Sequence, residues 1–557
     1  MVEIPENGGE RFRVLLLDDE RLARFTISSY LRKSDFEVVE AATPEEAMSS
    51  VKRAHFDAII TDVMMGEIDG FVFRDMIRRF DASVPIIFLT SMVNDYGNWL
   101  LEKISEDVRS HFVGKGLSRE MMALRVRQII GSYRRQRESE RIKGDFDAGL
   151  EMASFVQHSL LPPWTDLDRV YHYGVAWRPL EKVSGDLYEW IRVSRETALL
   201  IFGDVSGHGI RSALAMTAIQ SFLKRFAEFD DHRAARVHAI AAAIHEFIET
   251  NLREIIYMAG LVAYVDFKRN RIRFINAGLP GLKCVSGLTG ESIALNPESR
   301  GALPFGLVHD AQYSEDCVVE AAFPDDAVFM LATDGVTDGS ADPAGDRFVS
   351  PDVFDQVCSI AAVADYAGGT LMQTSANVLR ALEEMGYVHQ HDDRMMVTFA
   401  KAVLRPDRLV HEVEITPESI DLMSETMGMY ASSLSGDPAC STKVQLVMGE
   451  YLMNVYRHGL EGYVRHHEYA VVMGTMANGQ FELSVWDRGG DYHEFANLSL
   501  GDTQRRLDER NRALAGCGRG GAIMRILSGG GVRHERISNV NRTVFRIPVS
   551  PVSREGS

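Results

Sequence analysis

Residues 199–209 read Leu199-Leu200-Ile201-Phe202-Gly203-Asp204-Val205-Ser206-Gly207-His208-Gly209, and this stretch decides the fold of the central part of the chain. Its apolar half predicts a buried strand, which ends directly in a carboxylate among three glycines. Glycine lets the backbone approach a ligand closely, so a main-chain carbonyl such as that of Val205 can join Asp204 in holding a cation. The stretch therefore predicts a cation site at the end of a strand.

Three further carboxylate motifs flank this stretch: Ser184-Gly185-Asp186, Thr333-Asp334-Gly335 and Asp392-Asp393. A set of oxygen ligands selects Mg²⁺ or Mn²⁺ over zinc or copper. Two such ions about 3.5–4 Å apart would generate a hydroxide and neutralise a phosphoryl group attacked in line, so no side-chain nucleophile is needed. Asp-Gly alone is also a common hairpin dipeptide, and His208 fits either a general acid or a structural hydrogen-bonding residue.

These motifs resemble those of the bacterial branch of the PP2C-type phosphatases, which includes the sporulation and stress-response phosphatases that act on anti-sigma-factor antagonists. The resemblance extends from about Gln157 to about Ala402. It implies a two-layer β-sandwich with helices over residues 161–404 and a site for two Mg²⁺ or Mn²⁺ ions bridged by Asp204. The other implied ligands are Asp186, Val205, Asp334 and Asp392, with Asp393 as the alternative to Asp392.

The N-terminal part of the chain alternates β-branched or Leu-rich runs with helical patterns, which predicts a parallel sheet wrapped by helices. Asp18 and Asp19 follow one predicted strand, and Asp62 follows another. Ligands of open α/β sheets bind at the carboxyl ends of the strands. Three carboxylates there can hold one Mg²⁺, whose charge permits Asp62 to attack a phosphoryl donor, while Thr90 and Lys115 would bind the phosphoryl oxygens.

This segment resembles the response-regulator receiver family, and we place a doubly wound receiver domain at residues 11–134. The resemblance implies that Asp62 is the phosphoacceptor and that an upstream sensor histidine kinase is a partner. It also implies three metal ligands, Asp18, Asp19 and Asp62, for one ion, and three switch residues, Thr90, Phe112 and Lys115.

Residues 119–160 form a predicted helical connector. Met122, Val126, Ile129 and Tyr133 follow a spacing of three or four residues within a strongly basic stretch. A solvated helix with one apolar stripe and a coiled coil that forms a homodimer fit this pattern about equally well.

Residues 408–550 form a third predicted domain of helices, strands and a glycine-rich loop. Glu450 and Asn454 lie one helical turn apart and share a face. An amide oxygen can bind the Mg²⁺ carried by ATP, and a neighbouring carboxylate can orient or deprotonate an attacking hydroxyl. A glycine loop that precedes a helix presents backbone N–H groups to phosphate.

The ordered set resembles the GHKL ATPases, specifically the anti-sigma-factor serine kinase branch, which implies an α/β sandwich that binds ATP with one Mg²⁺ or Mn²⁺. By this resemblance Glu450 is the catalytic base, Asn454 binds the metal ion and Asp487 reads the adenine. The glycines assigned to ATP binding are Gly489, Gly518, Gly520 and Gly521.

Composition limits the remaining functional classes. The chain has 557 residues and a net charge of −19, which argues against direct DNA binding because phosphate backbones need clustered cations. The five cysteines include no CxxC pair, and no apolar run approaches the roughly 20 residues that span a bilayer. We therefore expect a cytoplasmic, reduced protein without a membrane segment.

These observations lead to one main hypothesis with two alternatives. The main hypothesis is a response regulator that dephosphorylates phosphoserine or phosphothreonine on a STAS-type anti-sigma-factor antagonist, with an opposing C-terminal serine kinase. In the first alternative, the C-terminal domain is only a nucleotide-regulated module for partner binding. In the second, the chain is a non-catalytic scaffold that sequesters an anti-sigma factor or its antagonist.

Overall fold

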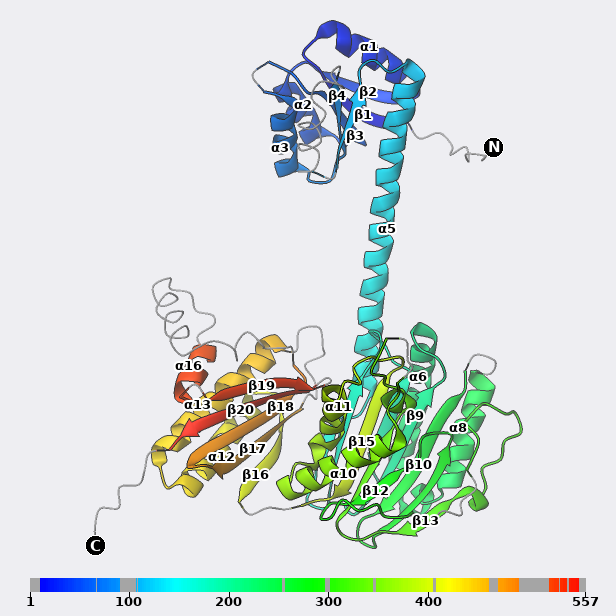
Figure 1. The fold of residues 1–557 in the computed structure, drawn as a ribbon, viewed down its shortest axis with the longest axis vertical. Coiled ribbons are helices and arrows are strands. Elements are labelled where there is room, and N and C mark those ends of the chain that lie inside the picture. Colours follow the sequence, from blue (N-terminus) through cyan, green and yellow to red (C-terminus); the bar gives the residue numbers. More distant parts are fainter. Residues whose placement is uncertain are drawn as a thin grey trace. The chain divides into compact units, whose positions relative to one another are not determined.

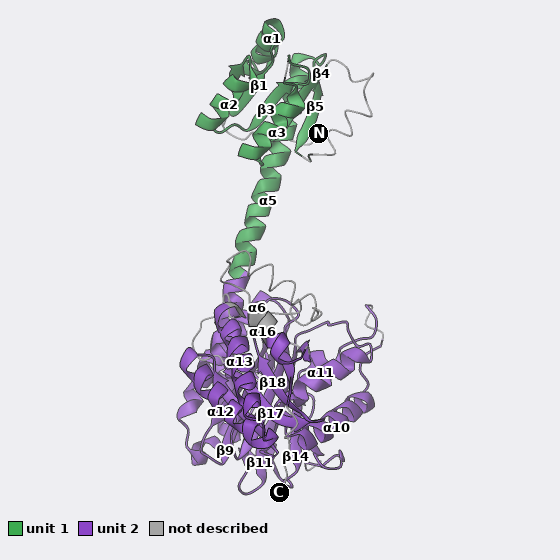
Figure 2. Cartoon of the chain, turned by 90° about the vertical axis from the view of Figure 1, so that its left-hand side faces the viewer, with its two compact units in different colours: residues 1–149 green, residues 150–557 purple. Residues whose placement is uncertain are grey.

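The computed structural model divides the chain into two compact units, Met1–Gly149 and Leu150–Ser557 (Figure 2). The structure describes residues 11–66, 68–90, 107, 109–252, 256–295, 301–343, 347–403, 407–459, 469–489, 520–529, 531–537 and 540–549. Among these described residues, none of the helices is both long enough and apolar enough to cross a membrane.

The first unit is a five-stranded parallel sheet with the strand order β2-β1-β3-β4-β5 (Figure 1). Its strands are β1 (Phe12–Leu17), β2 (Phe36–Ala41), β3 (Ala58–Asp62), β4 (Ile86–Thr90) and β5 (Ser110–Gly114), and its helices include α1 (Arg21–Arg32), α2 (Pro44–Arg53) and α3 (Gly70–Phe80). Apolar side chains fill two clusters on the sheet, as expected when helices cover both faces. The predicted doubly wound fold is confirmed.

Helix α5 (Arg119–Leu160) is 42 residues long and covers the range of the predicted connector. Met122, Val126 and Ile129 are buried in the core of the first unit, whereas most side chains between Arg134 and Gly149 are exposed. Most of the predicted apolar stripe therefore stabilises the receiver fold. Formation of a homodimer through the exposed part of the helix stays a prediction.

The second unit begins with two antiparallel five-stranded sheets, ordered β13-β11-β10-β9-β8 and β12-β14-β15-β7-β6. Side chains of both sheets share one large apolar cluster, so the sheets form the predicted two-layer sandwich. The strands are β6 (Thr165–Leu167), β7 (Tyr171–Arg178), β8 (Asp186–Arg192), β9 (Thr197–Val205), β10 (Met258–Asp266), β11 (Arg271–Ala277), β12 (Lys283–Ser286), β13 (Val319–Ala322), β14 (Ala327–Ala332) and β15 (Arg394–Lys401). The helices are α6 (Ile210–Leu223), η1 (Lys224–Glu228), α7 (Asp231–Ala234), α8 (Val237–Asn251), η2 (Glu315–Cys317), α9 (Asp334–Thr337), α10 (Pro351–Gly368), η3 (Leu371–Gln373) and α11 (Thr374–Glu384).

A further antiparallel sheet follows, with the order β16-β17-β18-β20-β19. It consists of β16 (Arg408–Glu414), β17 (Tyr469–Ala477), β18 (Gln480–Asp487), β19 (Val532–Ile537) and β20 (Val540–Pro548), with helices α12 (Pro417–Ser435), α13 (Pro438–Asn454), η4 (Val455–Gly459) and α16 (Gly520–Leu527). Thr416 and Asp437 cap α12 and α13, and each helix has proline in its first turn. The helices and the sheet share one apolar core.

The opposite face of this C-terminal sheet packs against the sandwich. Trp486 of β18 lies in an apolar cluster with Trp164 and Met372, and its Nε1 donates to Oε1 of Gln373 at 3.1 Å. The backbone N–H of Leu167 donates to Oε1 of Glu412 at 2.8 Å. The sandwich and the C-terminal sheet are therefore in direct contact within the second unit.

Candidate active sites

The carboxyl ends of the receiver strands bring together the three predicted metal ligands. Asp18, Asp19 and Asp62 each offer a carboxylate oxygen, and these oxygens all lie within 4.8 Å of one another. Within the described part of the chain, no other trio of His, Cys, Asp or Glu side chains is arranged so closely. This spacing and the all-oxygen chemistry fit one Mg²⁺ or Mn²⁺.

Lys115 reaches this trio from the end of β5. Its Nζ donates to Oδ2 of Asp62 at 2.6 Å and to Oδ2 of Asp18 at 3.0 Å. Burial raises the pKa of Asp62, although the hydrogen bond from Lys115 opposes this shift. Burial lowers the pKa of Lys115, but its bonds to the two carboxylates outweigh that effect and raise the pKa. The lysine is thus held as a cation beside the predicted phosphoacceptor.

The two remaining receiver residues lie next to this group in the sheet. Thr90 ends β4, and its carbonyl accepts from the backbone N–H of Lys115 at 2.8 Å. The Phe112 ring packs against Phe88 with 5.3 Å between the ring centroids. Thr90 therefore lies at the same ends of the strands as the carboxylates, whereas Phe112 lies within β5 against the apolar core.

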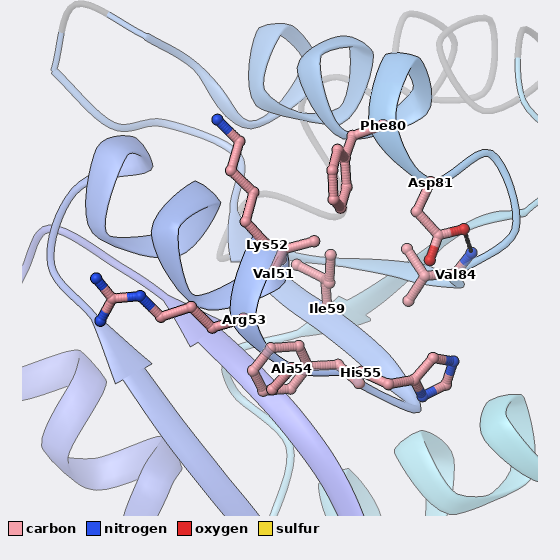
Figure 3. A pocket seen from close by; sticks show the side chains of 10 residues that line it. Val51, Lys52, Arg53, Ala54, His55, Ile59, Phe80, Asp81 and Val84 are labelled. Carbon is pink, nitrogen blue, oxygen red and sulfur yellow. Dashed lines mark hydrogen bonds between the residues drawn. The ribbon is translucent and has the colours of Figure 1, made fainter.

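A separate cavity of about 330 Å³ lies at the amino ends of β3 and β4, away from the carboxylates (Figure 3). Lys52, His55 and Phe80 line it, and Asp81 beside them accepts from the backbone N–H of Val84 at 3.3 Å. Because Asp62 ends β3, this cavity is at the opposite end of that strand from the predicted phosphoacceptor.

The second unit gathers four predicted phosphatase carboxylates from two sheets. Asp186 and Asp204 are paired across β8 and β9 of one sheet. Asp334 follows β14 of the other sheet, and Asp392 lies two residues before its neighbour β15. The sandwich thus places residues that are distant in the sequence at one end of two packed sheets.

Hydrogen bonds join the two sheets at this point. Oγ1 of Thr333 donates to Oδ2 of Asp186 at 3.2 Å. The two oxygens of Asp393 accept from the backbone N–H groups of Leu180 and Gly185, each at 2.7 Å. Asp393 is therefore occupied in fixing the loop that carries Asp186, and Asp392 is the better candidate for a metal ligand.

Close backbone approach explains two glycines of the motifs. A Cβ atom at Gly185 would lie 2.9 Å from the carbonyl oxygen of Val205, and a Cβ atom at Gly335 would overlap the carbonyl oxygen of Asp393. Neither position has room for a side chain. The glycines allow the four carboxylate loops to converge.

The electrostatics of this group favour a bound cation. Burial, reinforced by the neighbouring Asp204, raises the pKa of Asp186 well above its ordinary value. Burial and then Asp334 raise the pKa of Asp204 to about 9. The Oδ1 atom of Asp186 is buried without a hydrogen-bond partner. A divalent cation would neutralise these charges and supply the missing contact, so the residues fit Mg²⁺ or Mn²⁺.

Sequence reasoning missed three buried residues that support the site. Thr333 bonds Asp186, as described above. The Arg394 guanidinium donates to the carbonyl oxygens of Gly335 and His389 at 3.2 and 2.8 Å. Gln157, near the end of α5, donates to the carbonyl of Ser184 at 2.9 Å and accepts from its N–H at 3.1 Å. A polar residue on an apolar helix face was the available signal for Gln157.

We expect Gln157→Ala to impair catalysis and stability together, because it leaves the buried N–H and carbonyl groups of Ser184 without the partner that Gln157 supplies. The expected losses are about 2–4 kcal/mol in the free energy of unfolding and about tenfold in kcat. Urea denaturation and phosphate release from a phosphoserine peptide measure them. Gln136→Ala removes an exposed glutamine of the same helix as a control. Unchanged kcat in Gln157→Ala would contradict a role in holding the Asp186 loop.

The predicted nucleotide site lies on the helix-covered face of the C-terminal sheet. Asp487, at the end of β18, is fully buried and accepts from Tyr451 Oη at 2.7 Å, Asn541 Nδ2 at 3.0 Å and Gly489 N at 2.8 Å. Burial raises its pKa, although these bonds oppose the shift. The protein thus already supplies donors to both oxygens of the carboxylate that is expected to read adenine.

The other predicted residues of this site are placed in part. Glu450 and Asn454 are half-buried near the C-terminal end of α13. Gly520 and Gly521 begin α16, and Gly518 lies outside the described residues. The roles of these residues in nucleotide binding stay predictions.

Comparison with known proteins identifies two segments. Residues 14–115 match the family model described as response regulator receiver domain, and residues 194–401 match the model described as stage II sporulation protein E (SpoIIE). The chain is 25% identical to the phosphoserine phosphatase RsbP of Bacillus subtilis over 194 residues, which are 34% of this chain and 46% of that protein.

Matches to solved structures cover more of the chain. A structure of the RsbU and RsbW domains of Rv1364c from Mycobacterium tuberculosis has 16% identity and a TM-score of 0.35, and the match covers 70% of this chain and 95% of that one. The SiaA-PP2C domain of Pseudomonas aeruginosa has 21% identity and a TM-score of 0.37, and the match covers 46% of this chain and 98% of that one.

The alignments span only 12 to 54% of the length of four curated relatives, among them a probable transcriptional regulator of Porphyridium aerugineum. The similarity therefore identifies domains and not a whole protein. The chain therefore joins a segment that matches the response regulator receiver domain to a segment that matches SpoIIE and is similar to the phosphoserine phosphatase RsbP.

Proposed function

We propose that the chain is a response regulator that removes phosphate from phosphoserine or phosphothreonine of a STAS-type anti-sigma-factor antagonist. The observation that carries this proposal is the convergence of four carboxylates from two sheets, with the Asp186 Oδ1 atom left unpartnered. The name of the relative RsbP supports a phosphoserine substrate. The proposed domains are the receiver at 11–134, the phosphatase at 161–404 and a GHKL-like domain at 408–550.

The proposed phosphatase mechanism assigns distinct tasks to the carboxylates. Asp204, next to the last residue of β9, would bridge two Mg²⁺ or Mn²⁺ ions, with Asp186, Asp334, Asp392 and the carbonyl of Val205 as further ligands. When bound, these ions supply a hydroxide for in-line attack and neutralise the phosphoryl oxygens. Asp393 and Thr333 hold the loops of Asp186 in place through the bonds described above.

The proposed input is phosphorylation of Asp62 by an upstream sensor histidine kinase. Lys115 lies 2.6 Å from Oδ2 of Asp62 and would bind an oxygen of the phosphoryl group, as would Thr90. Helix α5 begins in the receiver fold, and Gln157 near its other end bonds the Asp186 loop. We infer that this helix transmits the input, and that phosphorylation activates the phosphatase.

To test this input, phosphate release from a phosphorylated antagonist is measured on the full chain with and without acetyl phosphate. We expect the phosphodonor to raise the rate severalfold in the wild type and to have no effect in Asp62→Asn, which retains the side-chain volume but cannot form the acyl phosphate. Equal rates with and without the donor in the wild type would refute receiver control, and an absence of release under all conditions would refute the phosphatase.

A second proposed activity is ATP-dependent serine phosphorylation of the same antagonist by the C-terminal domain. It is supported by Glu450 and Asn454, one turn apart on a single helix, and by the buried Asp487 at the end of β18. ATP would bind with one divalent ion at Asn454, and Glu450 would serve as the base.

The kinase is best assayed in an Asp204→Asn chain, in which dephosphorylation cannot hide phosphate transfer. Incorporation of phosphate into the unphosphorylated antagonist would support the kinase. Nucleotide binding without transfer would favour a regulatory binding module instead. A chain with neither transfer nor metal-dependent hydrolysis would be a scaffold.

A further inference from the structure

A cavity of about 540 Å³ lies where the phosphatase sandwich meets β16 of the C-terminal sheet. Arg169 contributes from the turn between β6 and β7, His172 from β7, and Arg195 from the turn between β8 and β9. Arg408 and His411 contribute from β16. This volume is in the usual range of small-molecule sites.

The cavity lies at the other end of the sandwich from the phosphatase carboxylates. Asp186 begins β8, whereas Arg195 follows the end of that strand. A strand of this length rises roughly 20 Å. The cavity is therefore separate from both the metal site and the proposed nucleotide site, and an occupant would have a function beyond those proposed above.

Positive charge dominates the lining, although the whole chain has a net charge of −19. The lining holds three arginines and two histidines but only one carboxylate, Asp168. That carboxylate is already engaged, because it accepts from Arg192 at 2.7 Å and from the N–H of Val170 at 2.9 Å. The cavity is thus a cationic region of an acidic protein and favours an anion.

Several polar groups of the lining lack protein partners. The side chains of Arg169 and Arg195 are exposed and form no ion pair or hydrogen bond with the residues that the structure describes. His172 is 6% exposed, and its Nδ1 atom is buried without a hydrogen-bond partner. Burial lowers the pKa of His172 to about 4, so the ring is neutral near pH 7 and offers one donor and one acceptor.

Arg408 differs from the other two arginines because its guanidinium is anchored. It donates to the carbonyl of Gly368 and lies 3.8 Å from the exposed Asp407. Leu167, Val403 and Leu409 add apolar surface between these charges. The cavity thus combines the fixed cation Arg408, two arginines without protein partners and an apolar wall. This lining suits a ligand that has an anionic part and a less polar part.

We propose that this cavity binds a small phosphate-bearing molecule, with Arg169 and Arg195 as its main contacts and the apolar wall against the rest of the ligand. Guanidinium groups match phosphate oxygens in charge and in fork geometry, so phosphate is the anion that two free arginines recognise best. Because residues from the sandwich and from β16 line the cavity, a bound ligand contacts both parts of the second unit.

The test is isothermal titration calorimetry of the full chain with uridine monophosphate and with inorganic phosphate. Chelator is present throughout, because it keeps phosphate from binding through metal ions at the other sites. Uridine monophosphate lacks the adenine that the Asp487 site is expected to read. We expect both probes to bind, the nucleotide more tightly because the face of its uracil ring, which is less polar than the phosphate, packs against Leu167 and Leu409.

Two double variants distinguish specific binding in the cavity from a general effect of the protein's charge on affinity. Arg169→Ala/Arg195→Ala should weaken nucleotide binding at least about tenfold, and the matching lysine variant should retain part of it. Arg135→Ala/Arg137→Ala makes the same change in charge on the exposed part of helix α5, which contributes no residue to the cavity, and should have no effect. Equal affinity in the first variant and the wild type, equal weakening in the two alanine variants, or no binding of either probe by the wild type would each overturn the proposal.

Discussion

Asp204→Asn should lower the rate of phosphate release at least about a hundredfold in the presence of Mn²⁺. The substitution keeps the volume of the side chain but removes the charge that would bridge two metal ions. It should also raise the melting temperature of the metal-free protein, because burial and Asp334 raise the pKa of Asp204 to about 9 and show that a charge is unfavourable there. Loss of activity with a gain in metal-free stability is the distinctive outcome.

Both quantities are measured on the full chain, activity with a phosphoserine peptide and melting in chelator. Asp325→Asn is the matched control, since it makes the same chemical change at an exposed carboxylate that pairs with Lys401. It should leave both values nearly unchanged. An active Asp204→Asn protein, or one that melts at a lower temperature without metal, would contradict the role assigned to this residue.

Gly335→Ala should cost about 2–4 kcal/mol in the free energy of unfolding and remove most of the phosphatase activity. The new Cβ would overlap the carbonyl oxygen of Asp393 and lie 2.9 Å from its carbonyl carbon. Relief requires the Asp334 and Asp392 loops to move apart, which separates two candidate ligands. Urea denaturation and the phosphatase assay measure the two effects.

Gly281→Ala provides the comparison for this glycine. A Cβ there would meet nothing within 4 Å, so the expected change in stability is within about 0.5 kcal/mol. If Gly335→Ala were as stable and active as Gly281→Ala, the loops would not be packed as tightly as described.

The receiver fold could be predicted closely from the sequence because its signals are local. The apolar run before Asp18 is β1 and the run before Asp62 is β3, and both are buried as full strands in a parallel sheet. Parallel strands buried on both faces appear as continuous apolar runs, and their carboxyl ends meet at one edge. The position of the carboxylate trio follows from these two facts.

The supporting residues of the phosphatase site could not be predicted in the same way. Thr333 bonds a residue 147 positions away, and Gln157 bonds one 27 positions away. Such pairs depend on how two sheets pack and leave no periodic trace in the sequence. For the same reason the sequence motif left Asp393 open as the alternative to Asp392, whereas the backbone donors around Asp393 distinguish the two carboxylates.

The packing of Trp486 has a practical consequence for dissecting the chain. Alternation along β18 places Leu483 and Val485 in the helix-covered core, whereas Trp486 faces the sandwich together with Val471 and Met473. Excision of the C-terminal domain at residue 407 would expose this aromatic and aliphatic surface to water. The isolated fragment would then self-associate through this exposed apolar surface, and the self-association could be mistaken for a native property of the domain.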